Sequence, residues 1–284
     1  MIRSFLETLA TIKIEHSIFA LPFAFASAFL AAEGCPEPRI LVLLLSAMVC
    51  ARCAGMAFNR YIDADIDAKN PRTDMRSIPA GRLTKRYALS FAIISAILFV
   101  LTTSAINSLS FMLSPIAVVL LFGYSYTKRF THYSHFVLGL VLGISPIGAW
   151  IAVRGELDLL PIILGLAVTL WTAGFDIIYS CQDVDFDKDE HLFSIPVYLG
   201  VSNSLRLVRL LHATMLGLLL LVGIWQSLGT IYWIGFVVVV GSLAYEHALV
   251  WNEDLSRINL AFFTMNGFVS IAFGSTTILS VMLG

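Results

Sequence analysis

The sequence is short of charged residues, which make up only 13% of its 284 positions, whereas soluble domains carry about 25%. Apolar residues make up 58%, and the mean hydropathy is +0.85. These values exclude an ordinary soluble globular domain and indicate that most of the chain lies in lipid. The net charge of -1 shows no excess of positive charge, so a nucleic-acid partner is not expected.

Cysteine is also scarce, with four residues in the chain. Cys50 and Cys53 form a C-x-x-C pattern inside a long apolar run, but a zinc ribbon needs a second such pair and a loop to hold it. We therefore interpret them as small packing residues of a helix. A cleavable signal peptide is not expected either, because Lys13 and Glu15 interrupt the first apolar segment.

Long apolar runs dominate what remains. A helix that crosses a bilayer needs roughly 17–25 mostly apolar residues, and reading for such runs predicts an all-α membrane protein, a single polytopic domain over residues 1–284. About nine transmembrane helices are expected, at residues 14–32, 40–58, 86–106, 109–125, 136–153, 159–181, 203–224, 229–248 and 259–282. The weakest boundary is the short polar interruption at residues 106–108.

Lysine and arginine are distributed unevenly over the predicted loops. Of the 18 residues, fifteen fall on the side that carries the N-terminus, Arg39 and Arg154 fall on the other, and Arg52 lies within the second span. Because positive residues accumulate in cytoplasmic loops, the N-terminus is predicted to be cytoplasmic and the C-terminus external.

Two acidic stretches lie on this cytoplasmic side. In the first, Asn59, Asp63 and Asp67 are spaced i, i+4, i+8, which places them on one helix face if the second helix continues beyond the membrane. The second follows the same helical spacing and is expected to extend the sixth helix; its residues are Asp176, Tyr179 (or Ser180), Asp183 and Asp187.

Carboxylate pairs on two helices are typical of Mg²⁺ that also binds a phosphorylated ligand, since magnesium commonly takes one or two carboxylates plus phosphate oxygens. Nearby basic residues would neutralise the remaining phosphate charge; they are Arg72, Arg76, Lys128 and Arg129. The alternatives are solvated helix ends and a calcium loop. The calcium loop is excluded because both D-x-D-x-D segments lack its glycine and its glutamate.

Two ionisable residues lie inside apolar spans, Arg52 and Asp176. Such residues are expensive in hydrocarbon and by default indicate an inward-facing functional group with a partner. Arg52 lies seven residues before Asn59, on about the same helix face. A cation there suits an acceptor with a carboxylate or an ionised hydroxyl; the alternative is a structural salt bridge, with Asp176 as one candidate partner.

The pattern N-x-x-x-D-x-x-x-D, then N-P-R-T-x-x-R-x-x-P-x-G, then D-x-x-Y-x-x-x-D-x-x-x-D resembles the UbiA superfamily of intramembrane prenyltransferases. The similarity runs over nearly the whole chain and is greatest to the bacterial branch that prenylates 4-hydroxybenzoate. The resemblance implies nine helices around a central cavity under a cytoplasmic cap. One departure is Arg60, where many members have aspartate.

The resemblance also implies roles. Mg²⁺ and diphosphate would be held by Asn59, Asp63, Asp67, Asp183 and Asp187. Arg72, Arg76 and Lys128 would contact diphosphate, Asp176 and Tyr179 belong to the substrate-binding set, and Arg52 would face the acceptor carboxylate.

The implied function is transfer of a polyprenyl group from polyprenyl diphosphate to an aromatic acid in quinone biosynthesis, in the bacterial inner membrane with the active site on the cytoplasmic side. No obligate protein partner is evident. Two alternatives remain: a dihydroxynaphthoate acceptor in menaquinone biosynthesis, and a membrane transporter, although the acids gather at one surface rather than at the midplane.

Overall fold

The protein is described by a computed structural model that covers Glu7 and residues 19–284. This part of the chain is helical and holds no strand. Its α-helices are α2 (Leu21–Ala32), α3 (Pro38–Asp67), α4 (Lys85–Ser104), α5 (Ser108–Thr127), α6 (Ser134–Arg154), α7 (Leu159–Ser180), α8 (Val184–Asp189), α9 (Ile195–Leu199), α10 (Val201–Trp225), α11 (Thr230–Leu249) and α12 (Asn266–Leu283). Shorter turns are η2 (Cys181–Asp183), η3 (Trp251–Glu253) and η4 (Leu260–Met265).

Eight of the helices in the described residues are long and apolar enough to cross a membrane. They coincide with the second to ninth predicted spans, so the expectation of an all-α, multi-pass membrane protein is confirmed. The first predicted span, 14–32, corresponds to the shorter helix α2, and its residues before position 19 lie outside the described part.

The polar break at residues 106–108 separates α4 from α5, as the sequence predicts. The side chain of Asn107 accepts a hydrogen bond from the Ser110 amide at 2.8 Å and so caps α5. Its Nδ2 donates to the carbonyl oxygen of Ile151 at 2.8 Å. One asparagine therefore satisfies the ends of two helices within this turn.

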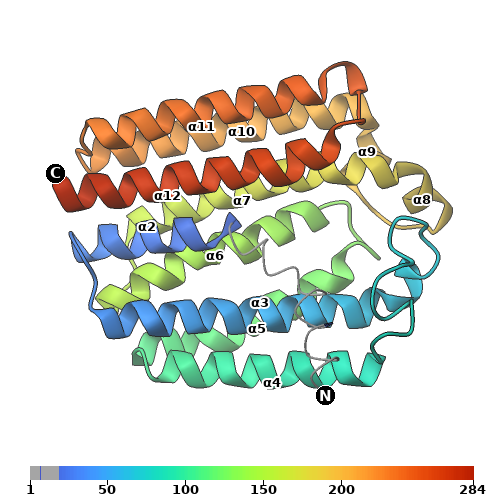
Figure 1. The fold of residues 1–284 in the computed structure, drawn as a ribbon, viewed down its shortest axis with the longest axis horizontal. Coiled ribbons are helices and arrows are strands. Elements are labelled where there is room, and N and C mark those ends of the chain that lie inside the picture. The colour runs from blue at the N-terminus through green and yellow to red at the C-terminus, as the bar shows by residue number, and fades with distance from the viewer. Residues whose placement is uncertain (1–6, 8–18) are drawn as a thin grey trace.

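The helices run side by side along the long axis of the molecule (Figure 1). One group contains α3, α4 and α5, another contains α7, α10, α11 and α12, and α2 and α6 lie between them. A buried cluster around Trp171, Phe23 and Phe273 fills the interior. Outer faces instead expose large apolar side chains such as Met112 and Val237, which is the distribution expected where lipid is the solvent.

The segments that carry the two acidic stretches meet at one end of the molecule, where the connection after α3 lies against α8 (Figure 1). Lys69 pairs with Glu190 there, with 2.6 Å between Nζ and Oε2. Residues about 120 positions apart in sequence are thereby joined.

The sixth helix extends past Asp187, as predicted, since Leu159–Asp189 forms one helix of 31 residues. It is not a regular α-helix throughout, because α7 ends at Ser180 and the turn η2 joins it to the short helix α8. The Ser180 hydroxyl donates to Ile177 O at 2.9 Å and the Gln182 amide to Tyr179 O at 2.8 Å. Such side-chain bonds offer the last carbonyls partners other than the backbone amides that would continue the helix.

Candidate functional site

Helix α3 continues to Asp67, as the spacing of the first acidic stretch predicts. Asn59, Asp63 and Asp67 are all buried near its end. Within this row, the Nδ2 of Asn59 donates to Oδ2 of Asp63 at 3.1 Å. The helix therefore presents three oxygen-bearing side chains in the geometry that the sequence suggested.

Asp63 is surrounded by cations from the turn after α5. The Nζ of Lys128 donates to its Oδ2 at 2.7 Å, and Nη2 of Arg129 donates to its Oδ1 at 3.0 Å. Arg129 also donates to Ile62 O on α3 and to Ser125 O on α5, so its guanidinium links these two helices. A nearly buried carboxylate with two cationic partners is electrostatically well compensated.

Asp67 is paired in the same way. Nη1 of Arg76 donates to its Oδ1 at 2.7 Å, and Arg60 lies 3.9 Å from Oδ2. That Oδ2 is buried and has no hydrogen-bond partner among the described residues. In the sequence, Arg60 was notable only because it replaces an aspartate found in similar proteins. In the structure it adds a positive charge beside Asp67.

Asp183 is paired with Arg72. Nε and Nη2 of Arg72 donate to its two oxygens at 2.9 and 2.6 Å, a bidentate pair. Nη1 of Arg72 donates to the Tyr179 hydroxyl at 2.9 Å, and Nδ2 of Asn70 donates to Asp183 Oδ1 at 3.2 Å. Burial opposes the charge on Arg72, but its bonds and attraction to Asp183 prevail and raise the pKa of the guanidinium.

Asp187 lies on α8, within electrostatic range of Asp183, Lys128 and His135. Lys128 thus acts on both Asp63 and Asp187. The two acidic stretches, 120 residues apart, lie around one lysine at the same end of the molecule. The backbone supports this arrangement, because the Phe193 amide donates to Lys128 O at 2.8 Å.

The donor set suits magnesium bound together with phosphate. No group of three or more His, Cys, Asp or Glu side chains in the described residues lies close enough to bind a metal by itself. Magnesium, however, commonly takes one or two carboxylates and completes its shell with water and phosphate oxygens. The acids supply oxygen ligands, and Asp67 Oδ2, which accepts no hydrogen bond from the described residues, offers one directly. The residues therefore fit a magnesium–phosphate pair.

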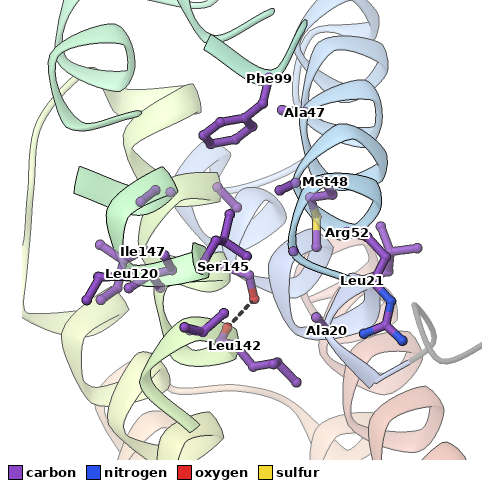
Figure 2. A pocket seen from close by; sticks show the side chains of 18 of the residues that line it. Ala20, Leu21, Ala47, Met48, Arg52, Phe99, Leu120, Leu142, Ser145 and Ile147 are labelled. Carbon is purple, nitrogen blue, oxygen red and sulfur yellow. Dashed lines mark hydrogen bonds between the residues drawn. The ribbon is translucent and has the colours of Figure 1, made fainter. Parts of the chain in front are cut away.

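A cavity of about 440 Å³ lies among α2 to α7, and its wall includes Met56, which precedes Asn59 by three residues on α3. Its wall is mostly apolar, but it includes Arg52 from α3 and Asp176 from α7. Figure 2 shows Arg52 beside Ala20 and Leu21, with Phe99 and Ala47 farther along the cavity. The two intramembrane ionisable residues noted in the sequence thus line one space.

Asp176 has a partner that sequence reasoning missed. The Nδ1 of His135, on α6, lies 2.6 Å from Asp176 Oδ2, and the imidazole is buried. The suggested salt bridge between Arg52 and Asp176 is not among the ion pairs of the described residues. The signal for the observed pair was a histidine at the start of one apolar span and an aspartate within the next.

Asn70 was also missed. Besides its bond to Asp183, its Oδ1 accepts from the Arg72 amide at 2.9 Å, so it orients the loop that carries Arg72. Its place at the start of the N-P-R-T segment was the available signal. The structure otherwise gathers the residues proposed from the sequence at the polar end of the molecule, except Arg52 and Asp176, which line the cavity.

Comparison with known proteins gives the same picture. The model of the UbiA prenyltransferase family matches residues 20–268. The 4-hydroxybenzoate octaprenyltransferase of Vibrio cholerae is 33% identical over 252 residues, which covers 89% of this chain and 88% of the relative. The apo structure of a UbiA homolog from Aeropyrum pernix K1 superimposes with a TM-score of 0.86 at 32% identity, covering 94% of this chain and 98% of that one.

A UbiA homolog from Archaeoglobus fulgidus bound to DMAPP and Mg²⁺ has a TM-score of 0.71 at 18% identity, covering 96% of this chain and 99% of that one. At this identity the likeness concerns the fold alone.

Proposed function

Because the chain belongs to the UbiA prenyltransferase family, we propose that it transfers a polyprenyl group from polyprenyl diphosphate to an aromatic acid, 4-hydroxybenzoate, and releases diphosphate. The observation that carries the proposal is the pairing of a polar end with an apolar cavity. Four aspartates and five Lys or Arg residues around them gather at one end, next to a cavity whose wall holds Arg52 and Asp176.

The polar end is the proposed diphosphate site. Magnesium would be held by Asn59, Asp63, Asp67, Asp183 and Asp187. When bound, Mg²⁺ would neutralise charge on the leaving diphosphate and act as a Lewis acid. Lys128, Arg72 and Arg76 now pair with these aspartates; when diphosphate binds, they would turn to its oxygens and stabilise the charge that develops as the allylic C–O bond breaks.

The cavity is the proposed acceptor site. The Arg52 guanidinium would bind the carboxylate of the aromatic acid, an interaction that is strong where water is excluded. The ring would then lie between Arg52 and the diphosphate, and a ring carbon would attack the allylic carbon as the C–O electron pair leaves with diphosphate. The apolar wall excludes water, which would otherwise attack the allylic carbon as it becomes positively charged.

The new C–C bond leaves one extra proton on the ring. Asp176 lines the cavity, and we propose that its carboxylate accepts this proton. The His135 imidazole at 2.6 Å would hold the carboxylate in orientation and share the proton. Carbon–carbon bond formation and restoration of the aromatic ring are then complete without a further reactant.

The uneven distribution of Lys and Arg supports an orientation in which this polar end faces the cytoplasm of a bacterial cell. The name of the Vibrio cholerae relative supports a role in ubiquinone biosynthesis. Both are parts of the proposal.

The test is an assay of purified protein in detergent or liposomes with Mg²⁺ and farnesyl diphosphate, comparing 4-hydroxybenzoate with 1,4-dihydroxy-2-naphthoate and with no acceptor. The expected result is prenylated 4-hydroxybenzoate and one pyrophosphate per product. Preference for the naphthoate would reassign the acceptor. Failure to use any aromatic acceptor, with the protein folded, would overturn the proposal.

A further inference from the structure

A second buried polar group lies outside the site, among α7, α10, α11 and α12. It includes Glu246 and Asn266, both 0% exposed, and His212 at 1%. Ionisable residues inside a membrane protein are costly and mark a functional role by default. None of these residues lines the cavity or belongs to the acidic stretches.

Asn266 is the centre of the group. Its Oδ1 accepts from Trp171 Nε1 at 2.6 Å, and its Nδ2 donates to Glu246 Oε1 at 3.1 Å. The same Nδ2 approaches two backbone carbonyls, Ala261 O at 3.2 Å and Phe262 O at 3.0 Å. The amide therefore joins two neighbouring helices to the turn before α12.

That turn is η4, a π-helical turn over Leu260–Met265. A π-turn leaves carbonyls without their regular α-helical partners. Such turns are rare in proteins, but those that occur are often at functional sites. Here the Asn266 amide satisfies two of the carbonyls. Glu246 and Trp171 hold the amide in place, so the turn depends on bonds from other helices.

The residue carried by this turn is Phe262, which lines the cavity. Its ring lies 4.2 Å from the Tyr179 ring, centroid to centroid, and packs edge-on against Phe175. Tyr179 in turn accepts from Arg72 through its hydroxyl and lies under the guanidinium at 5.1 Å. Arg72 donates a hydrogen bond to each carboxylate oxygen of Asp183.

We infer that Asn266, held by Glu246 and Trp171, is a positioning residue for the diphosphate site: it maintains the π-turn that sets Phe262 against Tyr179 and so aligns Arg72. The inference rests on the proposed function for the ligand of Arg72. Loss of the π-turn would shift the helical register by one residue, about 100° of rotation, and would turn the Phe262 ring away from Tyr179.

The effect expected is specific to one substrate. Arg72 contacts diphosphate before the reaction begins, so its misalignment weakens ground-state binding and raises KM for the prenyl diphosphate. The acceptor carboxylate is proposed to bind Arg52 on α3, and Phe262 contributes only apolar wall to that cavity, so KM for the acceptor should change much less. A purely structural role would instead lower the amount of folded protein and kcat, and would leave both KM values as they are.

The experiment compares Asn266→Asp with the wild type. The aspartate keeps the acceptor for Trp171 but replaces the donor that faces Glu246 and the two carbonyls. We expect KM for farnesyl diphosphate to rise roughly tenfold, the order of a weakened charge-assisted bond, with a much smaller change in KM for 4-hydroxybenzoate. Calorimetric titration with inorganic pyrophosphate and Mg²⁺ should show a matching loss of affinity.

Further variants cover the case in which Asn266→Asp does not fold. Phe262→Leu removes the ring contact with Tyr179 and leaves the hydrogen bonds of Asn266 in place, and it should raise the same KM. Glu246→Gln keeps an oxygen acceptor for Asn266 and should retain wild-type KM values, whereas Glu246→Leu should not. Thr277→Val is the matched control, because Thr277 is buried on α12 away from the turn.

The outcomes separate the two proposals. A wild-type protein that transfers no prenyl group would defeat the proposed function, while the pyrophosphate titration would still test the alignment of Arg72. If the wild type is active and both Asn266→Asp and Phe262→Leu leave the farnesyl diphosphate KM and the pyrophosphate affinity unchanged, the positioning role is overturned.

Discussion

Lys128, in the turn after α5, donates a hydrogen bond of 2.7 Å to Asp63 near the C-terminal end of α3. Arg72 and Asp183 repeat this arrangement between the loop after α3 and the turn after α7, and Arg76 and Asp67 repeat it within one segment. Each of these acids therefore has its own basic partner. We interpret these ion pairs as the ligand-free state of the site. When magnesium and diphosphate bind, the aspartates would bind the metal and the basic side chains would bind the phosphate oxygens.

Replacing Asp63 by asparagine should lower prenyl transfer by roughly 100-fold or more, because one charged ligand of the proposed metal is lost and Lys128 loses its partner. Asp65→Asn is the matched control. Asp65 lies two residues away in the same helix, its side chain is 85% exposed, and it pairs with Lys85. Initial rates for both variants at saturating Mg²⁺ test this, and equal activity of the two would contradict the metal role.

Magnesium alone should stabilise the protein little, because the acids already have cationic partners in its absence. Magnesium with pyrophosphate should stabilise it clearly, by about 2.7 kcal/mol at a ligand concentration 100 times Kd. Thermal unfolding in detergent with Mg²⁺, with pyrophosphate, and with both provides the measurement. EDTA should abolish the joint effect. A full shift with Mg²⁺ alone would mean that the carboxylates form a metal site without phosphate.

Arg72→Lys should raise KM for the prenyl diphosphate about tenfold, although the charge is kept. Lysine cannot reproduce the planar fork that now engages Asp183 and Tyr179 together. Arg206→Lys serves as the control, since Arg206 lies exposed on α10 and contacts Asn203 of its own helix. Steady-state kinetics with varied farnesyl diphosphate would show the difference, and identical KM values for the two variants would exclude a fork-shaped contact.

The sequence predicted the long helices well because their length and apolar content are dictated by the bilayer. It also predicted that α3 continues to Asp67, since a three-residue row at i, i+4, i+8 has a clear periodicity. It predicted that the sixth helix extends through Asp187 but not the turn η2 within it, because the competing bonds of Ser180 and Gln182 are local and have no periodic signature.

The partners within the site were less predictable than its members. Asp63, Asp183 and Asp187 were identified from spacing, but the pairing of Asp176 with His135 depends on how α6 packs against α7. The π-turn of η4 is a stronger case, because Trp171 and Glu246 maintain it from other helices. Nothing in residues 260–265 themselves distinguishes them from an ordinary apolar helix.

Gly143→Ala should destabilise the protein by about 1–3 kcal/mol, the usual cost of overpacking. A Cβ at this position would lie 2.5 Å from the backbone oxygen of Gly165 and closer still to Thr169 Oγ1, so α6 and α7 would have to separate. Gly148→Ala on the same helix is the control, because its Cβ would meet no atom within 4 Å. Unfolding temperatures in one detergent compare the two; equal values would show that α6 and α7 pack less closely than described.

Arg52→Gln should raise KM for 4-hydroxybenzoate by roughly ten- to a hundredfold, the cost of losing a hydrogen bond to a charged group. The farnesyl diphosphate KM should stay the same, because the cations proposed to hold diphosphate are at the other end of the site. The control is a change of substrate rather than of protein: 4-hydroxybenzamide lacks the carboxylate, so the wild type and Arg52→Gln should use it equally poorly. If the variant lost activity equally with both acceptors, Arg52 would be supporting the cavity rather than recognising an acid, and the acceptor would have to be sought among neutral phenols.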